Sequence, residues 1–274
     1  MSIKRLLPGS VAGNARAKKA LAVLGAFLFW LAVWQVAHII VGRDFLLTSP
    51  AQTLHRMLRF GGEAVFWRSV WATGQRVLSG FSLAMLCGGL LAFASAGRPW
   101  VKTLLAPMIG TVRATPVVSF ILLALMWMTS HTLPVFIAFL MVLPLAYSNL
   151  LAGLENLDRQ LLEMTRLFAF PRLRVLRLIY IPSLMPYLTA ACATGLGFAW
   201  KAAIAAEVIS HPALSVGRQM HRARIYFEVA DLFAWTVAVV IISVLLEKCT
   251  LWLLRALTNR LQRLSTAKAG EHHD

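Results

Sequence analysis

Three ionisable side chains lie inside long apolar stretches of this sequence: Arg113, Lys201 and Glu207. A charge within a membrane-spanning helix costs at least ~2.5–3.5 kcal/mol, so each needs a partner or a water-filled path. Lys201 and Glu207 are six residues apart, about 240° around a helix, and are therefore poor partners for each other. These three charged residues and Ser119 are the candidates to line a path of positive character for an anion. The open alternative is that Arg113 reaches the membrane edge and Lys201 pairs with a carboxylate on another helix.

The sequence carries no motif of a soluble catalytic or metal centre. It contains no G-x-x-x-x-G-K-[ST] loop, G-x-S-x-G elbow or H-E-x-x-H pair, and its seven histidines lack ligand spacing. Cys87, Cys192 and Cys249 each lie within apolar runs, as small packing residues do. We therefore expect no catalytic residue, metal or cofactor in the chain. A membrane-embedded enzyme would have only Lys201 and Glu207 as an acid–base pair, and their spacing argues against it.

The composition indicates that a bilayer surrounds much of the chain. Of 274 residues, 59% are hydrophobic and only 14% charged, with a mean hydropathy of +0.70, whereas a soluble protein needs about a quarter charged. The net charge of +16 would indicate nucleic acid in a soluble protein. In a membrane protein it indicates cytoplasmic loops rich in Lys and Arg beside anionic lipid, and no nucleic-acid partner is expected.

Uncharged windows long enough to cross a bilayer predict an all-α integral membrane protein with six transmembrane helices. The longest window, 114–154, contains the polar residues Thr129 to Thr132 and divides into two crossings. The first apolar run is too long for a signal peptide and is taken as a retained helix. The predicted spans are 20–42, 77–97, 105–128, 133–154, 183–209 and 231–254, between an N-terminal tail 1–19 and a C-terminal tail 255–274.

The distribution of positive charge predicts that both termini are cytoplasmic. With that orientation, 17 of the 27 Lys and Arg residues fall in or beside the inner segments and eight in the outer ones. Inner loops accumulate such residues because they resist translocation.

Two stretches have a packing interpretation. Ser49 and Pro50 predict the N-cap and first residue of an amphipathic helix lying at the outer interface and extending past Val65 and Arg68; a solvated connector is the alternative. The small residues of 190–197 favour close helix approach, either between two copies of the chain or within one.

The long inner segment 155–182 predicts a helical hairpin. Asn156 is the expected N-cap of a first helix, and Pro171 is expected to begin a second one that ends before Pro182. Such a hairpin projects into the cytoplasm as a surface that another protein can bind.

The residues Glu163-Met164-Thr165, then Ala169, then Ile179-Tyr180-Ile181-Pro182 resemble the EAA loop of binding-protein-dependent ABC importer permeases, E-A-A, three residues, G, nine residues, I-x-L-P. The glutamate, the spacing and the final proline match. Met164 and Thr165 replace the alanines and Ala169 replaces the glycine, which is acceptable only if the bend does not need a positive φ.

Three further stretches resemble the nitrate, sulfonate, taurine and thiamine-precursor branch of that family: LLTSPAQTL (46–54), RATPVVSFILLALMW (113–127) and GLGFAWKAAIAAEVI (195–209). Taken in order with the loop, these stretches extend over nearly the whole chain.

The resemblance implies a bacterial inner-membrane permease that works as a homodimer, with two ATP-binding subunits that hold ATP and Mg and an extracytoplasmic solute-binding protein. It implies coupling to the ATPase through Glu163, Arg166, Ala169, Arg172, Ile179 and Pro182. Arg218, Arg222 and Arg224 of the outer segment 210–231 are the expected dock for the binding protein.

The solute expected from this branch is a small anion such as nitrate, taurine or an alkanesulfonate. A thiamine-precursor-like nutrient is the alternative within the branch. A self-sufficient secondary transporter is the alternative from another class, but it predicts internal inverted repeats, and no convincing repeat is visible.

Overall fold

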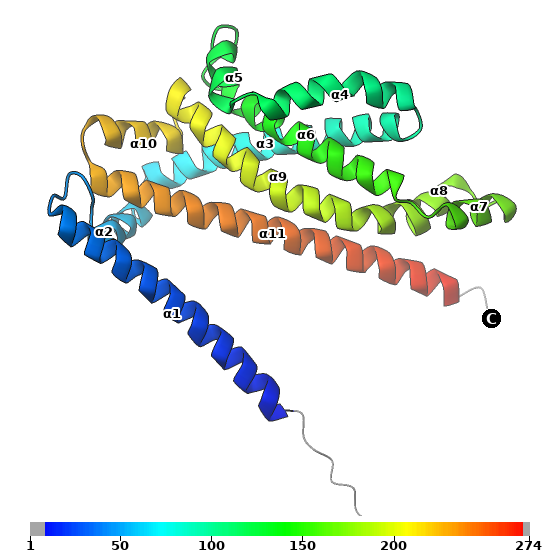
Figure 1. The fold of residues 1–274 in the computed structure, drawn as a ribbon, viewed down its shortest axis with the longest axis horizontal. Helices are drawn as coiled ribbons and strands as arrows, with labels where there is room; N and C mark the ends of the chain where they lie inside the picture. The colour runs from blue at the N-terminus through cyan, green and yellow to red at the C-terminus, as the bar shows by residue number, and fades with distance from the viewer. Residues whose placement is uncertain (1–8, 271–274) are drawn as a thin grey trace, which may run out of the picture. The chain divides into compact units, whose positions relative to one another are not determined.

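The computed structural model describes residues 9–270, and all regular secondary structure in that range is helical (Figure 1). Residues 1–8 of the predicted N-terminal tail and 271–274 of the C-terminal tail lie outside the described range. In chain order the helices are α1 Gly9–Val41, α2 Pro50–Gly61, α3 Ala64–Ala96, α4 Pro99–Ala114, α5 Val117–Ala124, α6 Leu133–Glu155, α7 Arg159–Leu167, α8 Arg172–Val175, the π-turn η1 Leu176–Tyr180, α9 Ile181–Ser210, α10 Val216–Ile225 and α11 Val229–Gly270.

The described helices confirm the predicted fold class. Five are long and apolar enough to cross a membrane, and a sixth crossing is obtained if the bent pair α4 and α5 counts as one span. The bend between α4 and α5 is 99°. It falls at Pro116, which follows Thr115 in an extended conformation (φ −80°, ψ 132°). Proline lacks the backbone N–H that would continue α4 and restricts the residue before it, so the sequence dictates this break.

The contacts divide the chain into two units, each described by itself. The larger one runs from Glu63 to Arg222 and resumes at Trp235. Its core is α3, α6 and α9 packed side by side (Figure 1). A Cβ added at Gly80 would lie 2.5 Å from the Val135 carbonyl oxygen, and one at Gly88 would lie 2.9 Å from the Tyr147 nitrogen. These glycines therefore permit direct backbone contact between α3 and α6, the usual route to tight helix packing in lipid.

The small-residue run of α9 serves packing within one chain on one of its sides. Ala191, Cys192 and Gly195 are buried, and a Cβ on Gly195 would meet the side chains of Val142 and Phe81. A Cβ on Gly197 would meet no atom within 4 Å, so the opposite side is open.

The smaller unit contains α1, α2 and the segment Ala223–Ala234. Ser49 caps α2 in a capping box with Gln52, and Pro50 occupies its first turn, as predicted. The α1 residues Trp34 and His38 hold the incoming chain through the carbonyl oxygens of Thr48 and Leu47. Arg56 of α2 forms an ion pair with Asp231.

Two predicted boundaries were wrong. The amphipathic helix ends at Gly61, and Val65 and Arg68 belong to α3, which begins well before the apolar window at 77. The pair Gly61-Gly62 explains the break, since glycine ends helices readily.

The hairpin also differs in detail from the prediction. Asp158, not Asn156, caps α7, and its carboxylate accepts the backbone N–H groups of Gln160 and Leu161. The second helix does not end before Pro182: the π-turn passes directly into α9, where Pro182 lies in the first turn. Proline is tolerated there because first-turn N–H groups have no helical partner.

Candidate functional site

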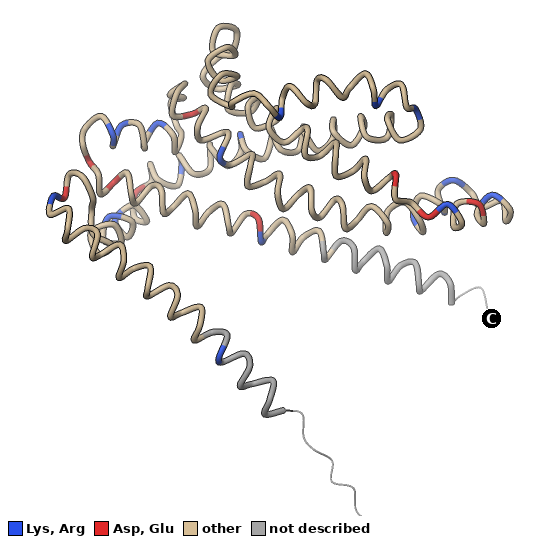
Figure 2. The backbone as a smooth tube through the Cα atoms, viewed as in Figure 1, with Lys and Arg blue, Asp and Glu red and all other residues tan. Residues whose placement is uncertain are grey.

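The hairpin of α7 and α8 presents charged and apolar side chains together. Glu163, Arg166 and Arg172 are exposed, and the positive charge of the segment is visible in Figure 2. Leu167 is 84% and Phe168 69% exposed. Large exposed apolar side chains beside charges on a short hairpin are typical of a protein-binding surface.

Ala169 adopts a left-handed conformation with φ 45° at the bend of the hairpin. The Ala169 N–H donates to the Arg166 carbonyl oxygen (3.2 Å) and the Phe170 N–H to that of Thr165 (2.9 Å). This pair of bonds is a Schellman C-cap, whose left-handed position is normally glycine. The condition under which alanine would be tolerated at no cost is therefore not met, because the bend does require a positive φ.

We expect the substitution Ala169→Gly to stabilise the hairpin by about 1 kcal/mol, because glycine removes the steric cost of a left-handed alanine. Hydrogen exchange at residues 169 and 170 should slow about fivefold. The control Ala51→Gly lies inside the helix α2, where glycine is less stable than alanine, so it should speed hydrogen exchange in that helix. Faster exchange at residue 170 in Ala169→Gly would contradict this expectation.

The far end of the hairpin is anchored on the bundle. Ile179 is buried, and the ring of Tyr180 stacks on Phe93 of α3 with centroids 6.4 Å apart. Pro182 follows directly in α9. The matching I-x-I-P residues therefore join the exposed hairpin directly to a spanning helix.

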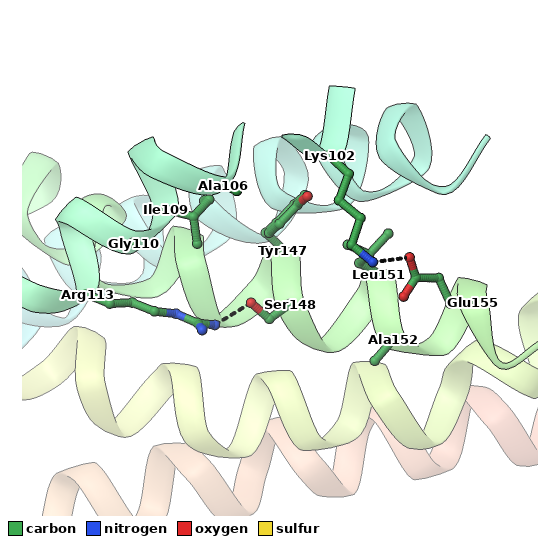
Figure 3. A pocket seen from close by; sticks show the side chains of 10 residues that line it. All are labelled: Lys102, Ala106, Ile109, Gly110, Arg113, Tyr147, Ser148, Leu151, Ala152 and Glu155. Carbon is green, nitrogen blue, oxygen red and sulfur yellow. Dashed lines mark hydrogen bonds and ion pairs between the residues drawn. The ribbon is translucent and has the colours of Figure 1, made fainter. Parts of the chain in front are cut away.

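Arg113 lies in a groove of ≈ 340 Å³ between α4 and α6 (Figure 3). Its Nη2 donates to the Pro144 carbonyl oxygen (3.2 Å) and to the Ser148 hydroxyl. At the other end of the groove Lys102 pairs with Glu155 at 2.6 Å. No ion pair joins Arg113 to a carboxylate of the described residues, so its charge is the uncompensated one in this groove.

Ser119 and Lys201 are both exposed. The Lys201 ammonium lies 6.0 Å from the ring centroid of Phe198, and no carboxylate within the described range pairs with it. The alternative in which Lys201 pairs with a carboxylate across the bundle therefore has no counterpart among these contacts.

Glu207 is fully buried in a cluster with Thr73 and Arg76 of α3. Its carboxylate accepts from Arg76 Nη1 (2.8 Å), from the Thr73 hydroxyl (2.9 and 3.0 Å) and from the Gly217 N–H (3.1 Å). The Arg76 side chain, 8% exposed, also donates to the Leu214 carbonyl oxygen (2.9 Å) and to His131 Nδ1 (3.2 Å). The buried carboxylate is thus paired and hydrogen-bonded, as a buried charge must be.

Sequence reasoning missed Thr73, Arg76 and Gly217. Arg76 directly precedes the predicted span 77–97 and is one of the eight Lys and Arg residues counted in the outer segments. The usable signal was that Glu207 needs a partner from another helix, but no feature of a single sequence identifies a residue 131 positions away.

The helix α10 carries Arg218 and Arg222, both exposed, with Arg224 exposed near its end. The Arg218 N–H donates to the Ser215 hydroxyl. At the start of this segment the rings of His211 and His221 are in contact, with centroids 3.8 Å apart. Burial, then the neighbouring charges of His221 and Arg218, lower the pKa of His211. The lowered pKa makes the His211 imidazole a weaker base beside these arginines.

Residues 84–263 match the family described as "binding-protein-dependent transport system inner membrane component". This range contains the hairpin, Arg113, Lys201 and Glu207.

Curated relatives align over much of the chain. The taurine transport system permease protein TauC of Escherichia coli is 27% identical over 237 residues, 83% of each chain. The putative aliphatic sulfonates transport permease protein SsuC of Escherichia coli is 25% identical, over 66% of this chain and 69% of its own. The nitrate import permease protein NrtB of Synechococcus elongatus is 24% identical, over 72% and 74%.

These relatives are transport permeases rather than enzymes, and the described helices agree with a multi-pass inner membrane protein. The chain belongs to the binding-protein-dependent transport family of inner membrane components, as an ABC importer permease of the branch that contains TauC, SsuC and NrtB.

Proposed function

We propose that this chain forms the translocation path of a bacterial ABC importer for a small anion and works by ATP-driven alternating access. The observation that carries the proposal is the exposed hairpin of α7 and α8, which holds Glu163 at the position of the motif glutamate and continues without a break into α9. Energy from ATP bound elsewhere enters the spanning helices at this point.

The proposed assembly contains two copies of the chain, two cytoplasmic ATP-binding subunits and an extracytoplasmic solute-binding protein. ATP and Mg are held by the ATP-binding subunits. Both termini are cytoplasmic, which places the hairpin on the ATPase side and α10 on the other. Coupling uses Glu163, Arg166 and Arg172 on the exposed hairpin, Ala169 at its bend, and Ile179 and Pro182 at its junction with α9.

The solute class is inferred from charge. Arg113 and Lys201 are cations without a carboxylate partner among the described residues, and Ser119 is exposed beside α4's break. An uncompensated cation in the membrane layer favours an anion in a water-filled path. The relatives are named for the anions nitrate, aliphatic sulfonates and, in CmpB of Synechococcus elongatus, bicarbonate, and for taurine, a zwitterion that carries an anionic sulfonate. These names support a solute with an anionic group. Glu207, predicted with this set, is fully buried, and its proposed role is to hold the segment 211–217.

The binding protein is proposed to dock on α10 through Arg218, Arg222 and Arg224. Acidic residues on the partner would complement these exposed arginines, and such rim charges act mainly on the rate of association.

Uptake into proteoliposomes tests the proposal. The complete importer should take up labelled taurine, an alkanesulfonate, bicarbonate or nitrate only with ATP inside and binding protein outside. Replacing Arg113 with glutamine should reduce uptake about 10- to 100-fold, because charge-assisted hydrogen bonds to the solute are lost.

The matched control is Arg98→Gln, an exposed arginine at the start of the same helix, which should leave uptake within about twofold. Competition by a cationic thiamine precursor but by none of the anions would contradict the anion proposal. Uptake without ATP would contradict the importer itself.

A further inference from the structure

The Thr73–Arg76–Glu207 cluster holds the backbone of one connecting segment at three points. Arg76 donates to the Leu214 carbonyl oxygen, the Val216 N–H donates to the Thr73 hydroxyl (3.0 Å), and the Gly217 N–H donates to Glu207. The Thr73 hydroxyl hydrogen points to Glu207 while its oxygen accepts from Val216, so one hydroxyl connects carboxylate and segment.

The segment fits its site too closely to move independently. A Cβ added at Gly217 would lie 2.4 Å from the Glu207 Cβ and 2.7 Å from the Val208 nitrogen. The start of α10 therefore lies directly against α9. Separating them would break the hydrogen bonds from the Gly217 N–H to Glu207 and from Arg76 to the Leu214 carbonyl oxygen, while the Arg76–Glu207 pair between α3 and α9 would remain.

The Arg76 guanidinium also contacts the turn between α5 and α6. Arg76 Nη2 donates to His131, in the turn between the bent α5 and α6, and the Ser210 hydroxyl lies 3.5 Å from the Ser130 carbonyl oxygen of that turn. The first half of α3, the end of α9, the start of α10 and the α5–α6 turn are thus connected through one buried ion pair.

A buried ion pair is a poor means of gaining stability alone, since apolar residues of similar volume often do as well. Its distinctive property is a fixed geometry that moves as a unit. We propose that the Thr73–Arg76–Glu207 cluster transmits contact of the solute-binding protein at α10 to α3, α9 and the α5–α6 turn. This inference rests on the proposed function, and the three side chains act as positioning residues that do not touch the solute.

The substitution Thr73→Val tests this role because it removes the connecting hydroxyl and keeps the side-chain volume. The complete importer in nanodiscs should keep its basal ATPase activity within about twofold, while stimulation by solute-loaded binding protein falls at least about tenfold. Thr73→Ser, which retains the hydroxyl, should restore stimulation. The control is Ser69→Ala, one turn earlier on α3, because the Ser69 hydroxyl is buried without a hydrogen-bond partner.

Hydrogen exchange on the permease alone adds a local measurement. In Thr73→Val, the amides of Val216 and Gly217 should exchange at least about tenfold faster, with no such change in Ser69→Ala.

Unchanged stimulation in Thr73→Val, or equal losses of basal and stimulated activity, would overturn the inference. Failure of the wild-type importer to hydrolyse ATP in response to binding protein would instead overturn the proposed function, and the exchange result would still report on the cluster.

Discussion

Replacing Glu207 with leucine is expected to destabilise the folded permease by about 3–5 kcal/mol, because Arg76 would remain buried without a counter-charge. The Gly217 N–H would lose its acceptor as well. The midpoint of SDS-induced unfolding in mixed micelles should fall sharply, together with the yield of monodisperse protein. The double variant Arg76→Met with Glu207→Leu should recover most of the loss, since no unpaired charge then remains.

The matched control for this prediction is Glu155→Leu. Glu155 also pairs with a cation, Lys102, but both side chains are about half exposed. Exposed ion pairs are screened by water and contribute little, so the same substitution there should shift the midpoint far less. Equal shifts of the midpoint for Glu207→Leu and Glu155→Leu would contradict the burial of Glu207. A double variant that is less stable than Glu207→Leu alone would contradict the charge argument.

Replacing Glu163 with arginine is expected to separate the permease from its ATP-binding subunit. The glutamate is exposed on α7 beside large apolar side chains, where a docked partner would enclose it. Reversing its charge in such an interface costs several kcal/mol, which corresponds to about a hundredfold weaker binding at ~3 kcal/mol. Quantitative co-purification should then recover almost no ATPase, and ATP-driven uptake should fall to background.

A change of the same type elsewhere checks that the effect is local. Glu63→Arg alters an exposed glutamate at the start of α3 whose side chain makes no cap hydrogen bond. It should leave co-purification intact. If Glu163→Arg also retained the ATPase, α7 would not be the coupling surface.

Much of this fold could be predicted because lipid imposes strong local rules. Five of the predicted spans fall on helices long and apolar enough to cross a bilayer, since length and polarity alone decide what crosses. The span predicted over 105–128 instead falls on the bent pair α4 and α5. The break that separates α4 from α5 is also a local effect, because the N–H that Pro116 lacks acts on its own helix. Ser49 and Pro50 predicted the start of α2, because an N-cap and a first-turn proline also act on the helix that they begin.

The errors fell where local signals were ambiguous. Asn156 and Asp158 are both good N-caps, and only the end of α6 at Glu155 decides between them. Ala169 was expected at the bend on the condition that no positive φ is needed there. A sequence does not report φ, and the Schellman hydrogen bonds require a left-handed residue at this position.

The Arg76–Glu207 pair could not be predicted, since it is a long-range contact. Charge and depth indicated that Glu207 needed a partner, yet many arginines were available. Only the packing of α3 against α9 selects Arg76, with Thr73 one turn away.

α8, the π-turn and α9 form one continuous helical rod between the hairpin and Glu207. The helical run from Arg172 to Ser210 contains 39 residues, which is about 58 Å at 1.5 Å per residue. Its one end is the hairpin and its other end carries Glu207. A tilt of ~5° about the middle of such a rod displaces each tip by ~2.5 Å in opposite directions. The π-turn at Leu176–Tyr180 and Pro186 within α9 are the two positions where such a rod can bend. A displacement of the hairpin would therefore reach Glu207, in the opposite direction, to the extent that these two positions stay straight.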